Sequence, residues 1–86
     1  MEITDVRIRY LHGDARMKAV ASITIDNAIA IHDIKIIASE EKLFLAMPSR
    51  RLSDGSFRDL VHPINADVRQ LIHDKIMAMY EDLPVL

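Results

Sequence analysis

The residues best suited to binding chemistry are two groups of cations in an otherwise acidic chain. There are 11 Lys and Arg residues against 13 Asp and Glu, which gives a net charge of −2 at pH 7. Such a protein does not attract a polyanion indiscriminately, so nucleic-acid binding would require cations gathered in one place. Basic residues do concentrate around Arg50, Arg51 and Arg58, and a second group includes Arg9 and Lys18.

The second group lies on two stretches that alternate between apolar and polar residues. The stretches, 3–10 and 17–25, flank His12-Gly13-Asp14, whose residue types favour a turn. A symmetric chain reversal at this turn predicts a hairpin with Arg9 opposite Lys18, and Arg7 lies on the same face. The other pairs of the predicted register are Ile8–Ala19 and Tyr10–Met17.

The first group flanks Asp54-Gly55, a dipeptide typical of tight hairpin turns. A symmetric loop pairs Arg51 with Arg58 and leaves Arg50 to pair with Asp59. A three-residue loop pairs Arg51 with Asp59 instead. Like charges directly opposite each other destabilise a sheet, and a bound polyanion would explain them because phosphates neutralise clustered guanidinium groups. Strand surfaces also carry Arg and Lys to prevent aggregation, so the charge pattern alone leaves both explanations open.

The rest of the chain predicts further strands and one helix. Residues 28–37 and 43–47 are rich in apolar residues. A change of apolar phase at His32-Asp33 indicates either a β-bulge, which we favour, or a strand covered on both faces. A helix is predicted to begin after Asn65, a favourable N-cap residue, and to stop before Pro84. Its predicted apolar face consists of Val68, Leu71, Ile72, Ile76, Met79 and Tyr80.

These elements predict an α+β fold, in which an antiparallel sheet of five to six strands, built from hairpins, carries one C-terminal amphipathic helix. No repeat or linker divides the chain, so we expect a single domain over residues 1–86. A core of this size is marginal for a monomer, and we therefore expect a homodimer that forms through sheet edges.

Other kinds of chemistry have little support in the sequence. The absence of cysteine excludes disulfides, thiolate metal sites and a cysteine nucleophile. No glycine-rich nucleotide loop or nucleophile motif is present, so we expect neither enzymatic activity nor a cofactor or small-molecule substrate. The four histidines lack metal-ligand spacing; we expect His32 and His62 to be partly buried structural residues, His12 to lie in a turn and His73 on the solvated helix face.

The chain shows no sign of a membrane association. It opens with acidic residues rather than a basic leader, and no apolar run approaches the roughly 20 residues that cross a bilayer. We therefore expect a cytoplasmic protein without a membrane partner.

A set of motifs spans most of the chain. Its central members are Phe44-Leu45-Ala46-Met47-Pro48-Ser49-Arg50-Arg51, Asp54-Gly55, Phe57-Arg58-Asp59 and His62-Pro63-Ile64-Asn65. The opening residues 1–7, Ala21-Ser22-Ile23-Thr24 and His32-Asp33-Ile34-Lys35 complete it. Together they resemble the bacterial stage V sporulation protein G family, although Ser53 stands where many members have proline.

This resemblance implies a small dimeric bacterial regulator that binds DNA, and in some members RNA, at selected sites and affects septation, cell division and sporulation. The family's basic pair, which is linked to DNA contact, matches Arg50 and Arg51. An alternative is a protein-interaction module of the septation or cell-wall pathway, with nucleic-acid binding incidental. It would use a sheet edge or the Met77–Met79 end of the helix.

Overall fold

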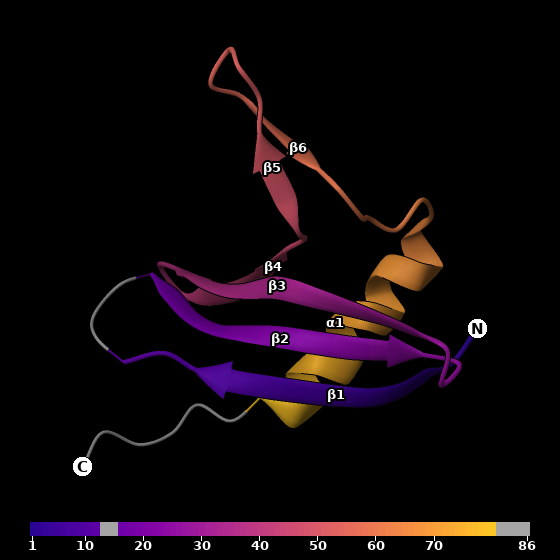
Figure 1. The fold of residues 1–86 in the computed structure, drawn as a ribbon. Coiled ribbons are helices and arrows are strands. Elements are labelled where there is room, and N and C mark those ends of the chain that lie inside the picture. The colour runs from indigo at the N-terminus through magenta and orange to yellow at the C-terminus, as the bar shows by residue number, and fades with distance from the viewer. Residues whose placement is uncertain (13–15, 81–86) are drawn as a thin grey trace.

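The computed structural model describes residues 1–12 and 16–80, which form six strands followed by one helix (Figure 1). The elements are β1 (Ile3–Tyr10), β2 (Met17–Ile25), β3 (Ile29–Ser39), β4 (Lys42–Ala46), β5 (Ser49–Arg51), β6 (Phe57–Asp59) and α1 (Ala66–Met79). All strand pairs are antiparallel, and the expected α+β class is confirmed.

The strands divide between two sheets. The first four form a meander in the order β1-β2-β3-β4, while β5 and β6 form a separate hairpin that projects away from it (Figure 1). Pro48 lies between β4 and β5 and lacks the N–H group that strand pairing needs, so it separates the two sheets.

Two residues with positive φ make the turn between β2 and β3. Asp26 and Asn27 have φ angles of 52° and 53°, and the Ala28 N–H donates to the Ile25 carbonyl at 2.9 Å. Asp and Asn tolerate this left-handed conformation, which a type I′ hairpin turn requires. The Asp26 N–H also donates to the Glu2 carbonyl at 2.8 Å, which ties the turn to the start of the chain.

A β-bulge interrupts the pairing of β2 with β3 at His32-Asp33, as predicted. Ala21 pairs with Ile34 and Ile23 pairs with Ile31, so two residues of β3 lie opposite Ser22. Asp33 adopts a φ of 64° within the bulge. The extra residue restores the apolar phase, so that isoleucines on both sides of the bulge face the core.

The predicted register of the first hairpin is wrong by two residues. Tyr10 pairs with Ala19 rather than Met17, and Arg9 pairs with Val20 rather than Lys18. A shift of two residues keeps the side chains from Ala19 to Ile25 on their predicted faces, so the alternation could not distinguish the two registers. The observed one places the small Ala19 beneath the helix and leaves Met17 exposed. The predicted turn at Gly13-Asp14 lies outside the described residues.

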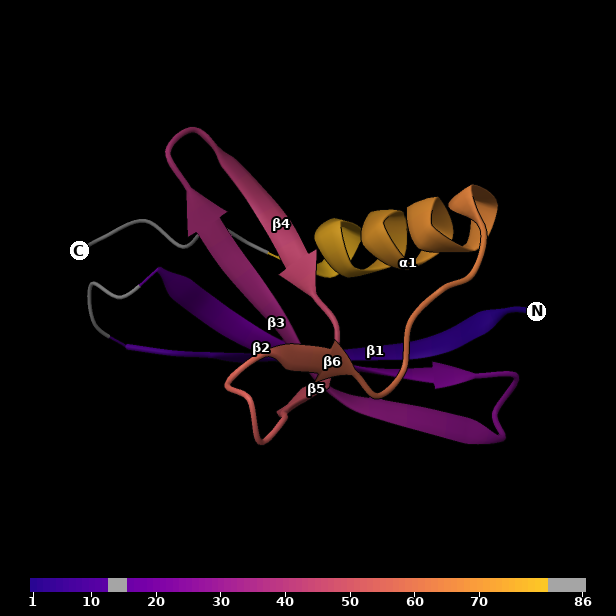
Figure 2. The ribbon, with the colours of Figure 1, turned by 90° about the horizontal axis from the view of Figure 1, so that it is seen from above.

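Helix α1 packs across one face of the four-stranded sheet (Figure 2). Its start is capped as predicted, because the Asn65 side chain accepts a hydrogen bond of 2.8 Å from the Val68 N–H, and Asp67 lies in the first turn. The buried core joins the helix to three strands. Its members are Ile3, Ala19, Ala21, Ile23, Ile34, Ile36, Ile72 and Ile76.

The end of the helix differs from the prediction. Met79 is 56% exposed, whereas Met77 packs against the core. The Tyr80 ring lies 5.7 Å from that of Tyr10, centroid to centroid, and closes this end of the core. The helix ends at Met79, and Pro84 lies outside the described residues. With 14 residues, it is too short to cross a bilayer, and the described part of the chain contains no other helix.

Candidate nucleic-acid interface

The clearest candidate site is the projecting hairpin of residues 49–59, here called the arginine arm. Its loop is a tight turn in which the Gly55 N–H donates to the Leu52 carbonyl at 3.0 Å and the Leu52 N–H donates to the Ser56 carbonyl at 2.7 Å. Gly55 has a φ of 91°, a conformation that other residues rarely adopt. This is the three-residue hairpin loop in which a type I turn is followed by a glycine bulge.

Asp54 stabilises the loop through its carboxylate. One carboxylate oxygen accepts hydrogen bonds from the Ser56 hydroxyl at 2.6 Å and from the Ser56 N–H at 2.9 Å. These two bonds favour the ionised form, and they lower the pKa of Asp54 below its ordinary value of 3.8. The tip of the arm is therefore held in shape by an ionised carboxylate.

The strand register of the arm corrects both predicted alternatives. Arg50 pairs with Arg58, and Asp59 pairs with Ser49 rather than with an arginine. The loop does have three residues, as in the second alternative. With its glycine bulge, however, it places Arg51 opposite Phe57, whereas that alternative placed Arg51 opposite Asp59. A like-charge pair is nevertheless present, and it involves Arg50 instead of Arg51.

Arg51 faces a different neighbour. Its partner across the arm is Phe57, which is 71% exposed. The Arg51 Nη2 atom lies 3.9 Å from the position that a Cβ atom would occupy at Gly55, so the guanidinium group follows the arm toward its tip. One face of the arm thus carries Arg50 and Arg58, and the other carries Arg51 beside an exposed aromatic ring.

The base of the arm rests on the four-stranded sheet. The Leu60 N–H donates to the Pro48 carbonyl at 2.7 Å and closes the hairpin. A hollow of about 330 Å³ lies where the arm meets the sheet. It is lined by Met17, Val20, Asp33, Lys35, Pro48, Ser49 and Leu60.

Arg9 and Lys18 are not brought together. Arg9 lies on the sheet face opposite α1, beside Val20. Lys18 lies in an irregularity of β2 between the Met17–Ile37 and Ala19–Ile36 pairs, and it lines a hollow with Glu40 and Tyr80 on the helix side. The irregularity changes the direction of Lys18, which simple alternation places beside Arg9.

His32 and His62 are more exposed than predicted, and His73 is less exposed. His32 and His62 are exposed, although each has a hydrogen bond: His32 Nδ1 lies 3.0 Å from Ser22 Oγ, and His62 Nδ1 lies 3.1 Å from the Pro63 carbonyl. His73 is half-buried beside the groove between β4 and α1. Among residues 1–12 and 16–80, no three His, Asp or Glu side chains come together as a metal site would require.

Sequence reasoning missed a row of polar side chains on the sheet face opposite α1. Arg7 pairs with Ser22, and Ser22 is hydrogen-bonded to His32 on the next strand. The alternation of Arg7 and Arg9 on β1 was the available signal. The contribution of His32 could not be read in the same way, because the bulge decides its direction.

Comparison with known proteins identifies the family of this chain. A family model described as SpoVG matches residues 1–82. The chain belongs to the SpoVG family. A protein of Staphylococcus aureus (strain MRSA252), named "Putative septation protein SpoVG", is 52% identical over 83 residues, which cover 96% of this chain and 83% of the relative. A protein of the same name from Staphylococcus haemolyticus (strain JCSC1435) is 52% identical over 82 residues, which cover 95% and 82% respectively.

The names of both relatives refer to septation. The matched residues include the whole arginine arm and both sheets. The resemblance inferred from the motifs around Arg50 and Arg58 is therefore confirmed.

Proposed function

We propose that this SpoVG protein is a non-enzymatic, nucleic-acid-binding regulator of the bacterial cytoplasm that places its arginine arm against the phosphate backbone of DNA or RNA. By analogy with the names of its relatives, the process it regulates is septation, with a link to sporulation. The observation that supports this function is the pairing of Arg50 with Arg58 on a projecting hairpin of an acidic protein.

The charges of the arm are available to a ligand. In the described part of the chain, the ion pairs are Arg7–Asp5 and His73–Asp74, and neither involves the arm. Both members of the Arg50–Arg58 pair are exposed. Like charges that face each other across a strand pair destabilise it by roughly 0.2–1 kcal/mol. Bound phosphates would remove this cost through charge-assisted hydrogen bonds.

Besides its charges, the arm carries an exposed aromatic side chain that can contact bases. Phe57 presents an exposed ring beside Arg51. Aromatic rings stack on unpaired bases of any sequence, and arginine adds a cation–π contact. The same arm can therefore contact the backbone of a duplex or an unpaired segment of RNA.

A homodimer is the second part of the proposal. Apolar side chains are exposed along the segment that follows the arm, where Ile64 is 88% exposed and Leu60 and Val61 are also open. Strand β4 is the last strand of its sheet, and Phe44 on it is exposed. Pairing of two copies through β4 and this apolar segment would bury these side chains and place two arginine arms on one particle.

The test is a fluorescence-anisotropy titration of labelled DNA and RNA at two salt concentrations. Arg50→Gln/Arg58→Gln should weaken binding, and the slope of log affinity against log salt should fall by about 2. Lys75→Glu on the helix makes the same change of net charge and should leave binding near wild type. Equal effects of the two variants would contradict a site on the arm.

The alternative, a protein-interaction module, is favoured by the same exposed apolar segment. It predicts a protein partner that stays bound after nuclease treatment, and a wild-type protein that binds neither DNA nor RNA at low salt. Sedimentation of the purified protein shows whether the apolar segment binds a second copy of the chain, which the alternative does not require. A pure Ile64→Ser variant that remains dimeric would contradict the proposed dimer surface.

A further inference from the structure

The face of the four-stranded sheet opposite α1, here called the open face, carries a second group of cations. Strand pairing aligns its side chains in two rows across β1, β2 and β3. The first row is Arg7, Ser22 and His32, and the second is Arg9, Val20 and Lys35. Rows of this kind are about 7 Å apart, since each residue of a strand advances the chain by about 3.3 Å.

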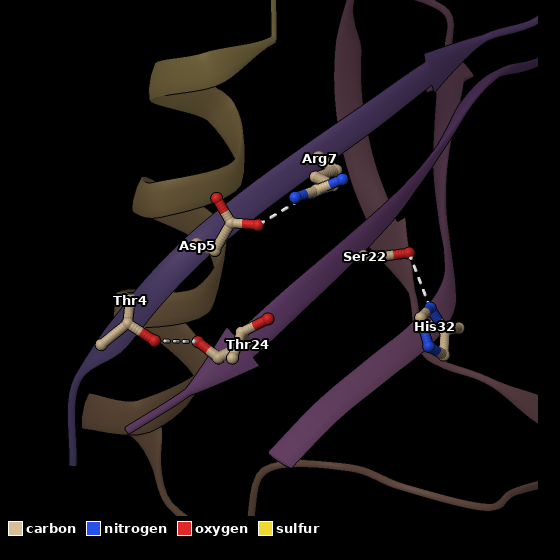
Figure 3. Close-up of polar contacts among 6 residues, drawn as sticks. All are labelled: Thr4, Asp5, Arg7, Ser22, Thr24 and His32. Atoms are coloured by element: carbon tan, nitrogen blue, oxygen red, sulfur yellow. Dashed lines mark hydrogen bonds and ion pairs between the residues drawn. The ribbon is translucent and has the colours of Figure 1, made fainter. Parts of the chain in front are cut away.

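Hydrogen bonds hold the first row in place. Ser22 Oγ lies 3.0 Å from Nδ1 of His32, which leaves the other ring nitrogen, Nε2, on the far side of the ring (Figure 3). The Arg7 Nε atom donates to a carboxylate oxygen of Asp5 at 3.0 Å, and the Arg7 side chain is 84% exposed. The Arg7 guanidinium group and the His32 ring are both oriented by neighbours and are both exposed.

The β-bulge accounts for the presence of His32 on this face. Two residues, His32 and Asp33, occupy the space opposite Ser22, and both are exposed. The bulge keeps Asp33 in the left-handed region at a φ of 64°, which has a cost for a residue other than glycine. Bulges are often found beside functional sites, where they redirect a side chain.

The open face is continuous with the base of the arginine arm. A shallow hollow of about 370 Å³ lies over the two rows and includes Arg7, Arg9 and His32 in its lining. It shares Val20 and Asp33 with the hollow at the base of the arm. The two hollows therefore adjoin each other, and the second reaches Ser49 at the base of the arm.

The charge on this surface favours an anion. Arg7, Arg9 and Lys35 are its permanent cations, and His32 adds a polar ring nitrogen. Two carboxylates lie beside them, Asp33 in the lining of both hollows and Asp5 against Arg7. Arginine suits phosphate because its planar group offers two parallel N–H donors.

We propose that the open face is a second phosphate-binding surface, at which Arg7, Arg9 and His32 contact the backbone of the same nucleic-acid strand that the arginine arm holds. This inference rests on the proposed function and extends it from the arm alone to a line of backbone contacts over the arm and the open face, here called the track. Backbone contacts of this kind position a protein on its ligand and carry no base preference. The track would add affinity and fix the orientation of the arm.

The test compares Arg7→Gln/Arg9→Gln with wild type, with Arg50→Gln/Arg58→Gln and with Lys75→Glu in titrations of a labelled DNA duplex. All three variants lower the net charge by two, and all three change exposed residues. The open-face variant should bind about tenfold more weakly than wild type, with a salt slope smaller by about 2. His32→Gln leaves the formal net charge unchanged and should weaken binding to a lesser extent.

A direct readout accompanies the titration. The ring signals of His32 and the amide signal of Ser22 should shift in NMR spectra when the DNA duplex is added to wild-type protein. An open-face variant that binds like Lys75→Glu, while the arm variant loses binding, would overturn the track and leave the arm in place. A wild type without any salt-sensitive binding would overturn the proposed function and this inference with it.

Discussion

Arg50 lies directly opposite Arg58 on a pair of three-residue strands. Across a hairpin this small, two like charges lower the stability of the pairing, and the arm has no buried core to offset the cost. Hydrogen bonds hold the arm at both ends: Asp54, Gly55 and Ser56 make them in the loop, and the Leu60 N–H donates to the Pro48 carbonyl at the base. Charge is thus concentrated on an element that contributes no residue to the buried core, which is the arrangement expected of a binding element.

Replacing Arg58 with glutamate should separate stability from binding. Arg58→Glu converts the like-charge pair into an ion pair with Arg50, so the arm should become more stable by roughly 0.2–1 kcal/mol. Affinity for DNA should nevertheless fall by more than tenfold, because a cation is lost and an anion is placed against phosphate. Hydrogen exchange of the arm amides measures the first effect and anisotropy the second. Arg58→Gln serves as the control that removes the repulsion without adding a negative charge.

Gly55 should be essential for the shape of the arm but not for the main fold. Gly55→Ala places a side chain at a φ of 91°, which costs on the order of 1 kcal/mol or more, although a Cβ atom there would meet only Arg51 at 3.9 Å. Because the arm forms its own two-stranded sheet, the NMR signals of residues 49–59 should change while the thermal midpoint stays close to wild type. Ser53→Ala is the matched control in the same loop. A large fall in the thermal midpoint would show that the arm and the main sheet unfold together.

The sequence was sufficient for the order of the elements and insufficient for their registers. Alternation and turn residues predicted the strands, the bulge at His32-Asp33 and the cap at Asn65. Both hairpin registers were wrong, because a shift of two residues preserves the alternation in the first hairpin and a glycine bulge changes the count in the second.

The candidate site could be predicted only in part, because it too depends on the strand registers. The motif around Arg50 and Arg51 identified the arm, but its internal pairing required the loop geometry. The rows on the open face join residues from three strands, and their alignment depends on the registers and on the bulge. Lys18 was grouped with Arg9 because its change of direction has no signal in the local sequence.

The lowered pKa of Asp54 predicts a local response to acid. A carboxyl group whose pKa is lower in the folded state stabilises that state at pH values above its unfolded pKa, close to 3.8, and this contribution is lost as the pH falls through the lowered value. The loop should therefore keep its geometry at neutral pH and lose it at a pH below 3.8. The amide chemical shift of Ser56 followed by NMR from neutral to acidic pH measures this. Asp54→Asn should remove the transition, and a transition of unchanged amplitude in that variant would assign it to another group.

Asp33 offers a prediction of the opposite sign, a gain in binding. Asp33→Asn keeps a residue type that tolerates the φ of 64° in the bulge and removes one of the two carboxylates beside the cations of the open face. If phosphates lie on this face, affinity for DNA should rise by about two- to threefold and the gain should shrink at high salt. Asp74→Asn on the helix makes the same change of net charge away from the open face and should have a smaller effect. Equal gains in the two variants would mean that the overall charge of the protein, rather than the carboxylate beside Arg7 and Arg9, controls the affinity.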